Sequence, residues 1–123
     1  RDCRLSRGLG DVYKRQALGY GGRNDIVSAS IRIAEHLKSD LISTDDIDED
    51  MIAKFSQVPD DNIDLIIRTG GDKRLSNFLL FQAAYAEIFF VDKLWPDFTR
   101  DDFKNCLDAF KKTDRRFGKR IED

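Results

Sequence analysis

The chain has 123 residues, of which 41% are hydrophobic and 36% are charged. This composition is typical of one small globular domain and excludes an intrinsically disordered chain. The formal net charge of −2 excludes a general affinity for nucleic acid, and no apolar run approaches the roughly 20 residues that span a bilayer. The two cysteines, Cys3 and Cys106, lack metal-ligand spacing and predict a reducing, cytoplasmic setting rather than a disulfide scaffold.

Residues 1–16 differ from everything that follows them. They show no helical or strand period, they lack the apolar stretch of a secretory leader, and five of the sixteen are Arg or Lys. The segment 8–16 resembles translated sequencing-adapter sequence, so we predict a foreign leader, with a genuine disordered tail as the alternative. The domain to be interpreted is then residues 17–123.

The first part of this domain predicts a strand stub, a glycine turn and two helices. Residues 17–20 form the stub, and residues 25–38, whose apolar side chains recur with helical period, form a helix that Asn24 can cap. The acidic cluster within residues 45–50 suggests either a metal site or the start of a short helix. We favour the helix, because acids suit its first turn and a calcium loop needs a mid-loop glycine that is missing here. The lone His36 has no second ligand nearby and is interpreted as structural.

The most informative run is residues 64–77. It begins with an unbroken apolar segment, residues 65–67, of the kind buried on both faces in a parallel sheet. A glycine pair then breaks this strand. Ser76 and Asn77 are suitable N-caps for a helix over the apolar residues 78–86. The predicted order is therefore strand, glycine loop and helix start.

Three cations accompany this pattern, Arg68, Lys73 and Arg74, against a single acid, Asp72. A helix start offers free N–H groups and a partial positive charge, arginine can hold a phosphate bidentately, and the Ser76 hydroxyl can add a donor. The run therefore predicts a phosphate or diphosphate site at the carboxyl end of a strand. A surface loop with solvated charges explains the spacing equally well, because the run matches neither the P-loop nor the dinucleotide-binding glycine motif.

The remainder of the chain predicts a second buried strand, residues 88–91, and a C-terminal helix. Glu87 stands at the edge of that apolar strand and needs a partner, for which magnesium or an arginine would serve. Thr99 and Asp102 approximate a capping box for the helix. The predicted buried stripe of the helix is Phe103, Leu107 and Phe110.

Several multi-residue motifs occur in register along residues 17–118. They are Arg68-Thr69-Gly70-Gly71, Arg74-Leu75-Ser76-Asn77-Phe78-Leu79-Leu80, Tyr85-Ala86-Glu87 and Leu94-Trp95-Pro96-Asp97-Phe98, with Tyr20-Gly21-Gly22-Arg23 and Arg115-Arg116-Phe117-Gly118 at the two ends. In these motifs the chain resembles the C-terminal part of a cis-prenyltransferase, most closely a bacterial undecaprenyl diphosphate synthase. The resemblance implies an α/β fold: the C-terminal part of a Rossmann-like parallel sheet flanked by helices, incomplete at the N-terminus.

The resemblance also implies a function. Members of this family condense isopentenyl diphosphate onto an allylic diphosphate, usually farnesyl diphosphate, and so make a polyprenyl diphosphate that carries cell-wall precursors. Mg²⁺ assists the reaction, and the enzymes are cytoplasmic homodimers that act near the inner face of the membrane, to which the lipid product attaches them peripherally. By motif position, the implied substrate-binding residues are Arg68, Arg74, Leu75, Ser76, Arg116 and Gly118, and the implied magnesium-associated acid is Glu87.

The chain departs from the family pattern at Asp72 and Lys73, where Glu and His are usual, and at Phe81, where Trp is common. The family's catalytic Asp belongs to an N-terminal half that is not in this chain, so we expect no catalytic residue in this fragment and no prenyl transfer by this polypeptide alone. We also expect unpaired sheet edges and an uncovered apolar face, and hence aggregation. Two alternatives stay open: a non-catalytic partner subunit of a cis-prenyltransferase, and a generic phosphate-binding α/β module.

Overall fold

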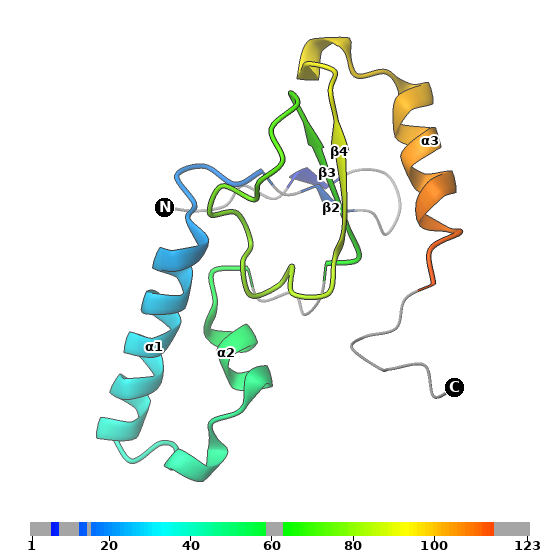
Figure 1. Ribbon diagram of the computed structural model, residues 1–123. Coiled ribbons are helices and arrows are strands. Elements are labelled where there is room, and N and C mark those ends of the chain that lie inside the picture. The colour runs from blue at the N-terminus through cyan, green and yellow to red at the C-terminus, as the bar shows by residue number, and fades with distance from the viewer. Residues whose placement is uncertain (1–5, 8–12, 15, 59–62, 115–123) are drawn as a thin grey trace.

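The computed structural model describes residues 6–7, 13–14, 16–58 and 63–114 (Figure 1). The secondary-structure elements are a mixture of helices and strands. In chain order they are β1 (Ser6–Arg7), β2 (Tyr13–Lys14), α1 (Gly22–Lys38), α2 (Glu49–Phe55), β3 (Leu65–Thr69), β4 (Glu87–Val91) and α3 (Arg100–Phe110), with short 3₁₀ turns at Thr44–Asp46 and Trp95–Asp97.

The centre of the fold is a parallel pair of strands, β3 and β4. Leu65 pairs with Glu87 and Thr69 pairs with Val91, so the two strands are in register over their whole length. The sequence predicted both strands and their parallel arrangement, and the structure confirms them as a mixed α/β fold. Within the described residues the parallel ladder contains these two strands, and the wider Rossmann-like sheet stays a prediction.

Two predictions near the N-terminus are wrong. Residues 17–20 form no strand, and the two-residue strands β1 and β2 pair in antiparallel fashion where no strand was expected. Helix α1 begins at Gly22, with Gly21 as its N-cap, rather than after Asn24. The physical reason is that the first N–H groups of α1 find their acceptors on a distant segment, as described below, so the helix needs no local side-chain cap.

Helices α1 and α2 pack against each other and lie together beside the strands, while α3 lies on the opposite side of the picture (Figure 1). Asp48 caps α2 by accepting a hydrogen bond from the Met51 N–H at 2.8 Å, which confirms the helix start predicted from the acidic cluster. The Arg32 guanidinium lies 5.0 Å from the centre of the Phe55 ring. A cation over an aromatic face is attractive, so this contact helps to join the two helices.

The helix predicted for residues 78–86 is wrong, because this segment consists of turns. Ser76, Asn77 and Leu79 have φ angles of 50°, 64° and 46°, which are incompatible with a right-handed helix. Each left-handed residue other than glycine costs of order 1 kcal/mol, so tertiary contacts must hold the turn. Within this segment Gln82 and Ala83 are buried, whereas the aromatic side chains of Phe78 and Tyr85 are 43% and 56% exposed.

Helix α3 confirms its predicted capping box. The Thr99 N–H and hydroxyl both donate to Asp102, at 2.8 and 2.7 Å, and the Asp102 N–H donates back to Thr99. Lys93 donates to the same carboxylate at 2.7 Å. These bonds favour the charged form, and the Lys93 ammonium above all lowers the pKa of Asp102 to about 2. The predicted buried stripe is not observed, because Phe103 is 47% exposed and Leu107 and Phe110 are half-buried.

Much apolar surface is uncovered, as the sequence predicted. Val27 and Ile31 on α1 are more than half exposed, and Trp95 is 72% exposed. The Trp95 ring stacks on Phe98 with centroids 5.9 Å apart. None of the described helices combines the length and apolarity needed to cross a bilayer. Large exposed apolar side chains favour association with another apolar surface. Aggregation of the isolated chain therefore remains a prediction.

Candidate functional site

The candidate site lies where β3 ends. Gly70 and Gly71 follow the strand with φ angles of 95° and 80°, a conformation that glycine adopts without a steric penalty. Their N–H groups are held by the neighbouring segment, since Gly70 donates to the Lys93 carbonyl at 2.8 Å and Gly71 to the Val91 carbonyl at 3.3 Å. The glycine pair therefore turns the chain sharply and returns residues 72–78 toward the end of β3.

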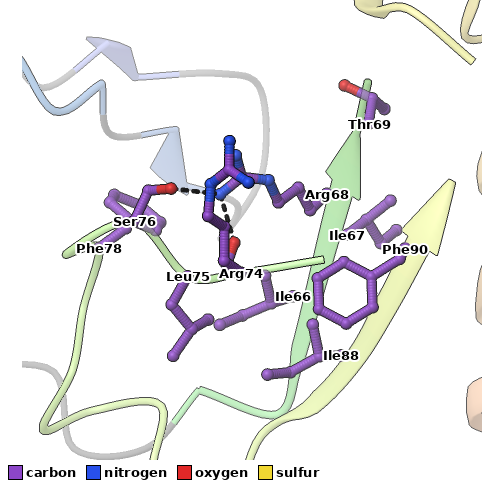
Figure 2. A pocket seen from close by; sticks show the side chains of 10 residues that line it. All are labelled: Ile66, Ile67, Arg68, Thr69, Arg74, Leu75, Ser76, Phe78, Ile88 and Phe90. Atoms are coloured by element: carbon purple, nitrogen blue, oxygen red, sulfur yellow. Dashed lines mark hydrogen bonds between the residues drawn. The ribbon is translucent and has the colours of Figure 1, made fainter. Parts of the chain in front are cut away.

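The returning segment brings together the three polar residues predicted for an anion site. The Arg68 Nη1 donates to the Ser76 hydroxyl at 2.9 Å and also to the main-chain carbonyl of Arg74 (Figure 2). The side chain of Arg68 is only 25% exposed, whereas that of Arg74 is 66% exposed. The two guanidinium groups converge on one side of the loop, so the geometry agrees with a cradle for a phosphate-bearing ligand.

Asp72 lies between the two guanidinium groups. Its Oδ2 is 2.7 Å from the Arg74 Nη2 and 3.4 Å from the Arg68 Nη2. Sequence reasoning treated Asp72 as the one acid among three cations and as a departure from the family pattern, and missed this bridging role. The signal that could have found it is its position four residues after Arg68, although that spacing predicts contact only in a helix.

Apart from Thr69, the rest of the pocket lining is apolar. It has a volume of about 420 Å³ and includes Leu75, the predicted substrate-binding residue that lies between Arg74 and Ser76. Figure 2 shows Leu75, Ile66 and Ile88 below the two arginines, whereas Phe78 lies beside Ser76. The pocket therefore joins an anion-binding end to a hydrophobic wall. The apolar lining residues are Ile66, Ile67, Leu75, Phe78, Ile88 and Phe90.

The predicted magnesium ligand lies elsewhere. Glu87 begins β4 and pairs with Leu65, whereas Arg68 pairs with Phe90 three positions further along the ladder. Glu87 does not line the pocket. In the parts of the chain that are described, no group of three His, Cys, Asp or Glu side chains could hold a metal ion. One carboxylate alone does not complete a magnesium site, because this ion demands octahedral coordination by oxygen atoms.

Two further predicted residues, Arg116 and Gly118, lie outside the described residues. Lys73 is exposed and is absent from the pocket lining. The structure thus brings together four of the predicted substrate-binding residues. They are Arg68, Arg74, Leu75 and Ser76.

A buried polar cluster outside the pocket lining was not predicted. Asp25, which is 2% exposed, accepts hydrogen bonds from the Tyr20 hydroxyl at 2.7 Å and from the Gln57 N–H at 2.6 Å. Gln82, also 2% exposed, donates to the Val58 carbonyl at 3.1 Å. Burial, together with the neighbouring Asp25 carboxylate, raises the pKa of the Tyr20 phenol. This cluster ties α1 to the segment after α2 and to the turns after the glycine loop.

The fold and the site define an α/β protein with a cationic cradle and an apolar wall at the end of a parallel strand. The family model described as "Putative undecaprenyl diphosphate synthase" matches residues 11–118. The chain belongs to this prenyltransferase family. The match begins inside the predicted leader, residues 1–16, whose foreign origin stays a prediction.

Curated relatives agree with this family. The chain is 47% identical over 126 residues to a farnesyl-diphosphate-specific ditrans,polycis-undecaprenyl-diphosphate synthase of Photorhabdus laumondii, and the match covers 100% of this chain and 49% of that protein. It is 48% identical over 103 residues to the synthase of the same name from Escherichia coli strain K12, covering 83% of this chain and 41% of that protein. The chain therefore spans about half, or less, of the length of these relatives.

Solved structures agree on the fold. A crystal structure of lavandulyl diphosphate synthase from Lavandula x intermedia in complex with dimethylallyl diphosphate matches with a TM-score of 0.77 and 37% identity, over 83% of this chain and 44% of that chain. A probable undecaprenyl diphosphate synthase from Campylobacter jejuni matches with a TM-score of 0.70 and 35% identity, over 83% of this chain and 45% of that chain.

Proposed function

We propose that this chain supplies the isopentenyl diphosphate site of a cis-prenyltransferase that extends farnesyl diphosphate to a long polyprenyl diphosphate. The observation that carries the proposal is the convergence of Arg68, Arg74 and Ser76 beside an apolar wall. Isopentenyl diphosphate has the same two-part character, because a strongly anionic head is joined to a small branched hydrocarbon. A nucleotide would present a larger polar group to the apolar wall.

The proposed role of the cradle is to hold the diphosphate of isopentenyl diphosphate, which is not released in the reaction. In the condensation the allylic substrate loses its diphosphate, whereas isopentenyl diphosphate keeps its own. Arg68 is mostly covered and fixed by the Ser76 hydroxyl and the Arg74 carbonyl, so its guanidinium direction is set before the ligand arrives. A hydrogen-bond donor that is already oriented loses little conformational entropy when the ligand binds. The more exposed Arg74 closes the cradle from the solvent side.

Other parts of the proposal rest on the family resemblance. Glu87 remains the proposed magnesium-associated acid, because one or two carboxylates together with substrate phosphates are a common way of holding this ion. Arg116 and Gly118 remain the proposed residues that reach the substrate of a neighbouring subunit in a homodimer. The product would be a membrane lipid carrier, which places the reaction at the cytoplasmic face of the membrane.

The diphosphate grip is tested by binding inorganic pyrophosphate and isopentenyl diphosphate to the purified chain in a calorimeter. Arg68→Gln removes charge-assisted hydrogen bonds to the ligand that contribute about 2 kcal/mol. We therefore expect its dissociation constant to rise by roughly thirtyfold. Lys73→Gln is the matched control, because it removes the same charge from the same loop at an exposed position. We expect that variant to stay within about threefold of the parent, since Lys73 does not line the pocket and salt screens an exposed charge.

Equal losses in the two variants would mean that only the general positive field attracts the ligand, and the cradle would be rejected. Binding of ADP as tight as that of isopentenyl diphosphate would favour a generic phosphate-binding module instead.

The purified 123-residue chain is expected not to elongate farnesyl diphosphate. The family resemblance assigns the catalytic Asp to an N-terminal half that is not among these 123 residues. Incorporation of radiolabelled isopentenyl diphosphate into butanol-extractable lipid is the measurement. Incorporation above the background of a heat-denatured sample would contradict this part of the proposal. Co-purification with a full-length synthase, together with a rise in that synthase's activity, would favour the partner-subunit alternative.

A further inference from the structure

The turn that carries Ser76 is conformationally unfavourable. Ser76, Asn77 and Leu79 all have left-handed φ angles, and none of them is glycine. Residues with a β-carbon avoid this region, although asparagine tolerates it better than most. Because Ser76 presents its hydroxyl to Arg68 from this turn, the shape of the cradle depends on whatever holds the turn in place.

The turn is held by the start of α1. The Gly22 N–H donates to the main-chain carbonyl of Asn77 at 2.6 Å, and the Arg23 N–H donates to the Asn77 side-chain Oδ1 at 2.8 Å. The first N–H groups of a helix have no partner within the helix, and they carry its partial positive charge. Asn77 therefore caps α1 from a segment 54 residues further along the chain.

Close approach of the two segments requires glycine on the α1 side. A β-carbon on Gly22 would lie 2.8 Å from the Leu80 Cγ, 3.0 Å from the Leu80 N and 3.2 Å from the Asn77 O. A β-carbon on Gly21 would lie 2.9 Å from the Asn77 Nδ2. The contacts at 2.8 and 2.9 Å, both with side-chain atoms, are steric clashes, and the two with backbone atoms are tight enough that the neighbouring backbone would have to shift slightly. The glycine pair thus serves packing, since the φ of Gly21 is −148° and needs no glycine.

We propose that Asn77 is a positioning residue for the anion cradle. By capping α1 with both its carbonyl and its side-chain oxygen, Asn77 fixes the left-handed turn and so holds the preceding Ser76 hydroxyl against Arg68. This inference rests on the proposed function for the identity of the ligand. The contact between α1 and the turn depends only on the hydrogen bonds from the Gly22 and Arg23 N–H groups to Asn77. The Asn77 side chain acts through Ser76 and Arg68, and no contact of its own with the ligand is needed.

The experiment compares three variants of the full 123-residue chain. Asn77→Gly keeps the left-handed backbone available but removes the Oδ1 acceptor. Asn77→Asp keeps an acceptor, and its charge suits a helix start. Asn24→Ala is the control, because Asn24 is an exposed asparagine on the same helix. The first readout is amide hydrogen exchange of peptides covering residues 74–80, and the second is the dissociation constant for inorganic pyrophosphate well below each melting temperature.

Loss of the hydrogen bond from the Arg23 N–H to the Asn77 side chain is expected to speed exchange in residues 74–80 of Asn77→Gly by roughly threefold to tenfold. Asn77→Asp is expected to restore slow exchange, and Asn24→Ala to leave it unchanged. Pyrophosphate affinity of Asn77→Gly is expected to fall by a similar roughly threefold to tenfold factor. Asn77→Asp is judged by exchange alone, since its added charge repels the anion.

Each other outcome decides a different point. Exchange in Asn77→Gly as slow as in the parent would show that the Asn77 side chain does not hold the turn, and would overturn its proposed role. Faster exchange with unchanged pyrophosphate affinity would make Asn77 a structural cap and overturn its positioning role. Failure of the parent chain to bind pyrophosphate at all would count against the proposed function, while the exchange comparison would still decide whether Asn77 holds the turn.

Discussion

Asp72 occupies the place between two guanidinium groups that an anionic ligand would need. The Asp72→Asn variant should therefore bind inorganic pyrophosphate more tightly than the parent chain. The carboxylate is paired with Arg74 at 2.7 Å and with Arg68 at 3.4 Å. A phosphate group that accepts hydrogen bonds from both guanidinium groups must first displace it. Asparagine keeps the size of the side chain but removes the charge that competes.

The size of the effect follows from the exposure of the groups. The Asp72 and Arg74 side chains are 47% and 66% exposed, so solvent weakens their attraction. Exposed ion pairs contribute about 0.2–1 kcal/mol each. Breaking two such pairs costs about 1 kcal/mol in all, which corresponds to a roughly fivefold change in dissociation constant. Repulsion between Asp72 and the ligand adds to this at low ionic strength, because salt screens exposed charges.

Isothermal titration with pyrophosphate at two ionic strengths measures this effect. Asp92→Asn is the matched control: Asp92 is an exposed acid whose Oδ1 lies 3.7 Å from a β-carbon built on Gly71, and no ion pair joins it to either arginine in the described part of the chain. We expect Asp72→Asn to bind about fivefold more tightly and Asp92→Asn to change little. Weaker binding by Asp72→Asn would refute the reasoning and show instead that Asp72 orients the two guanidinium groups for the ligand.

Two further predictions concern stability and ionisation. Asp25→Ala should lower the free energy of unfolding by about 3 kcal/mol in urea titrations, because it leaves the buried donors on Tyr20 and Gln57 unpaired; a change below about 0.5 kcal/mol, typical of surface sites, would contradict this. Lys93→Ala should raise the pKa of Asp102 part of the way from about 2 toward its ordinary value, as followed by carboxyl NMR shifts. Because the pKa of Asp102 is lowered in the folded state, the stability that Asp102 contributes is present above the ordinary carboxyl pKa and is lost as pH falls toward 2. If the Asp102 pKa measured in Lys93→Ala is unchanged, the hydrogen bonds from Thr99 alone set that pKa.

Features that depend on a few neighbouring residues were predictable. The apolar run 65–67 predicted β3, and the segment 88–91 predicted β4. Thr99 and Asp102 predicted the start of α3, because a capping box joins residues only three positions apart. The clustering of cations around a glycine break predicted that Arg68, Arg74 and Ser76 act together, and the structure brings them together; binding of an anion there stays a prediction.

Features that depend on contacts between distant segments were not predictable. The apolar residues 78–86 fit a buried helix by pattern, yet the left-handed turn before them and the contact with α1 give turns instead. Asn24 was predicted to cap α1, but Asn77 does so from another part of the chain. In the same way, no local pattern indicated that strand register sets Glu87, the predicted magnesium-associated acid, three ladder positions away from Arg68.

The sequence by itself determined which residues carry charge, which segments are apolar and where glycine lets the chain turn, because these are properties of single residues and near neighbours. Only the tertiary structure decided that Asp72 bridges the two guanidinium groups and that Asn77 joins α1 to the cradle. Hydrogen bonds of this kind form only after the chain has brought remote donors and acceptors to about 3 Å of each other, and no local pattern encodes that distance.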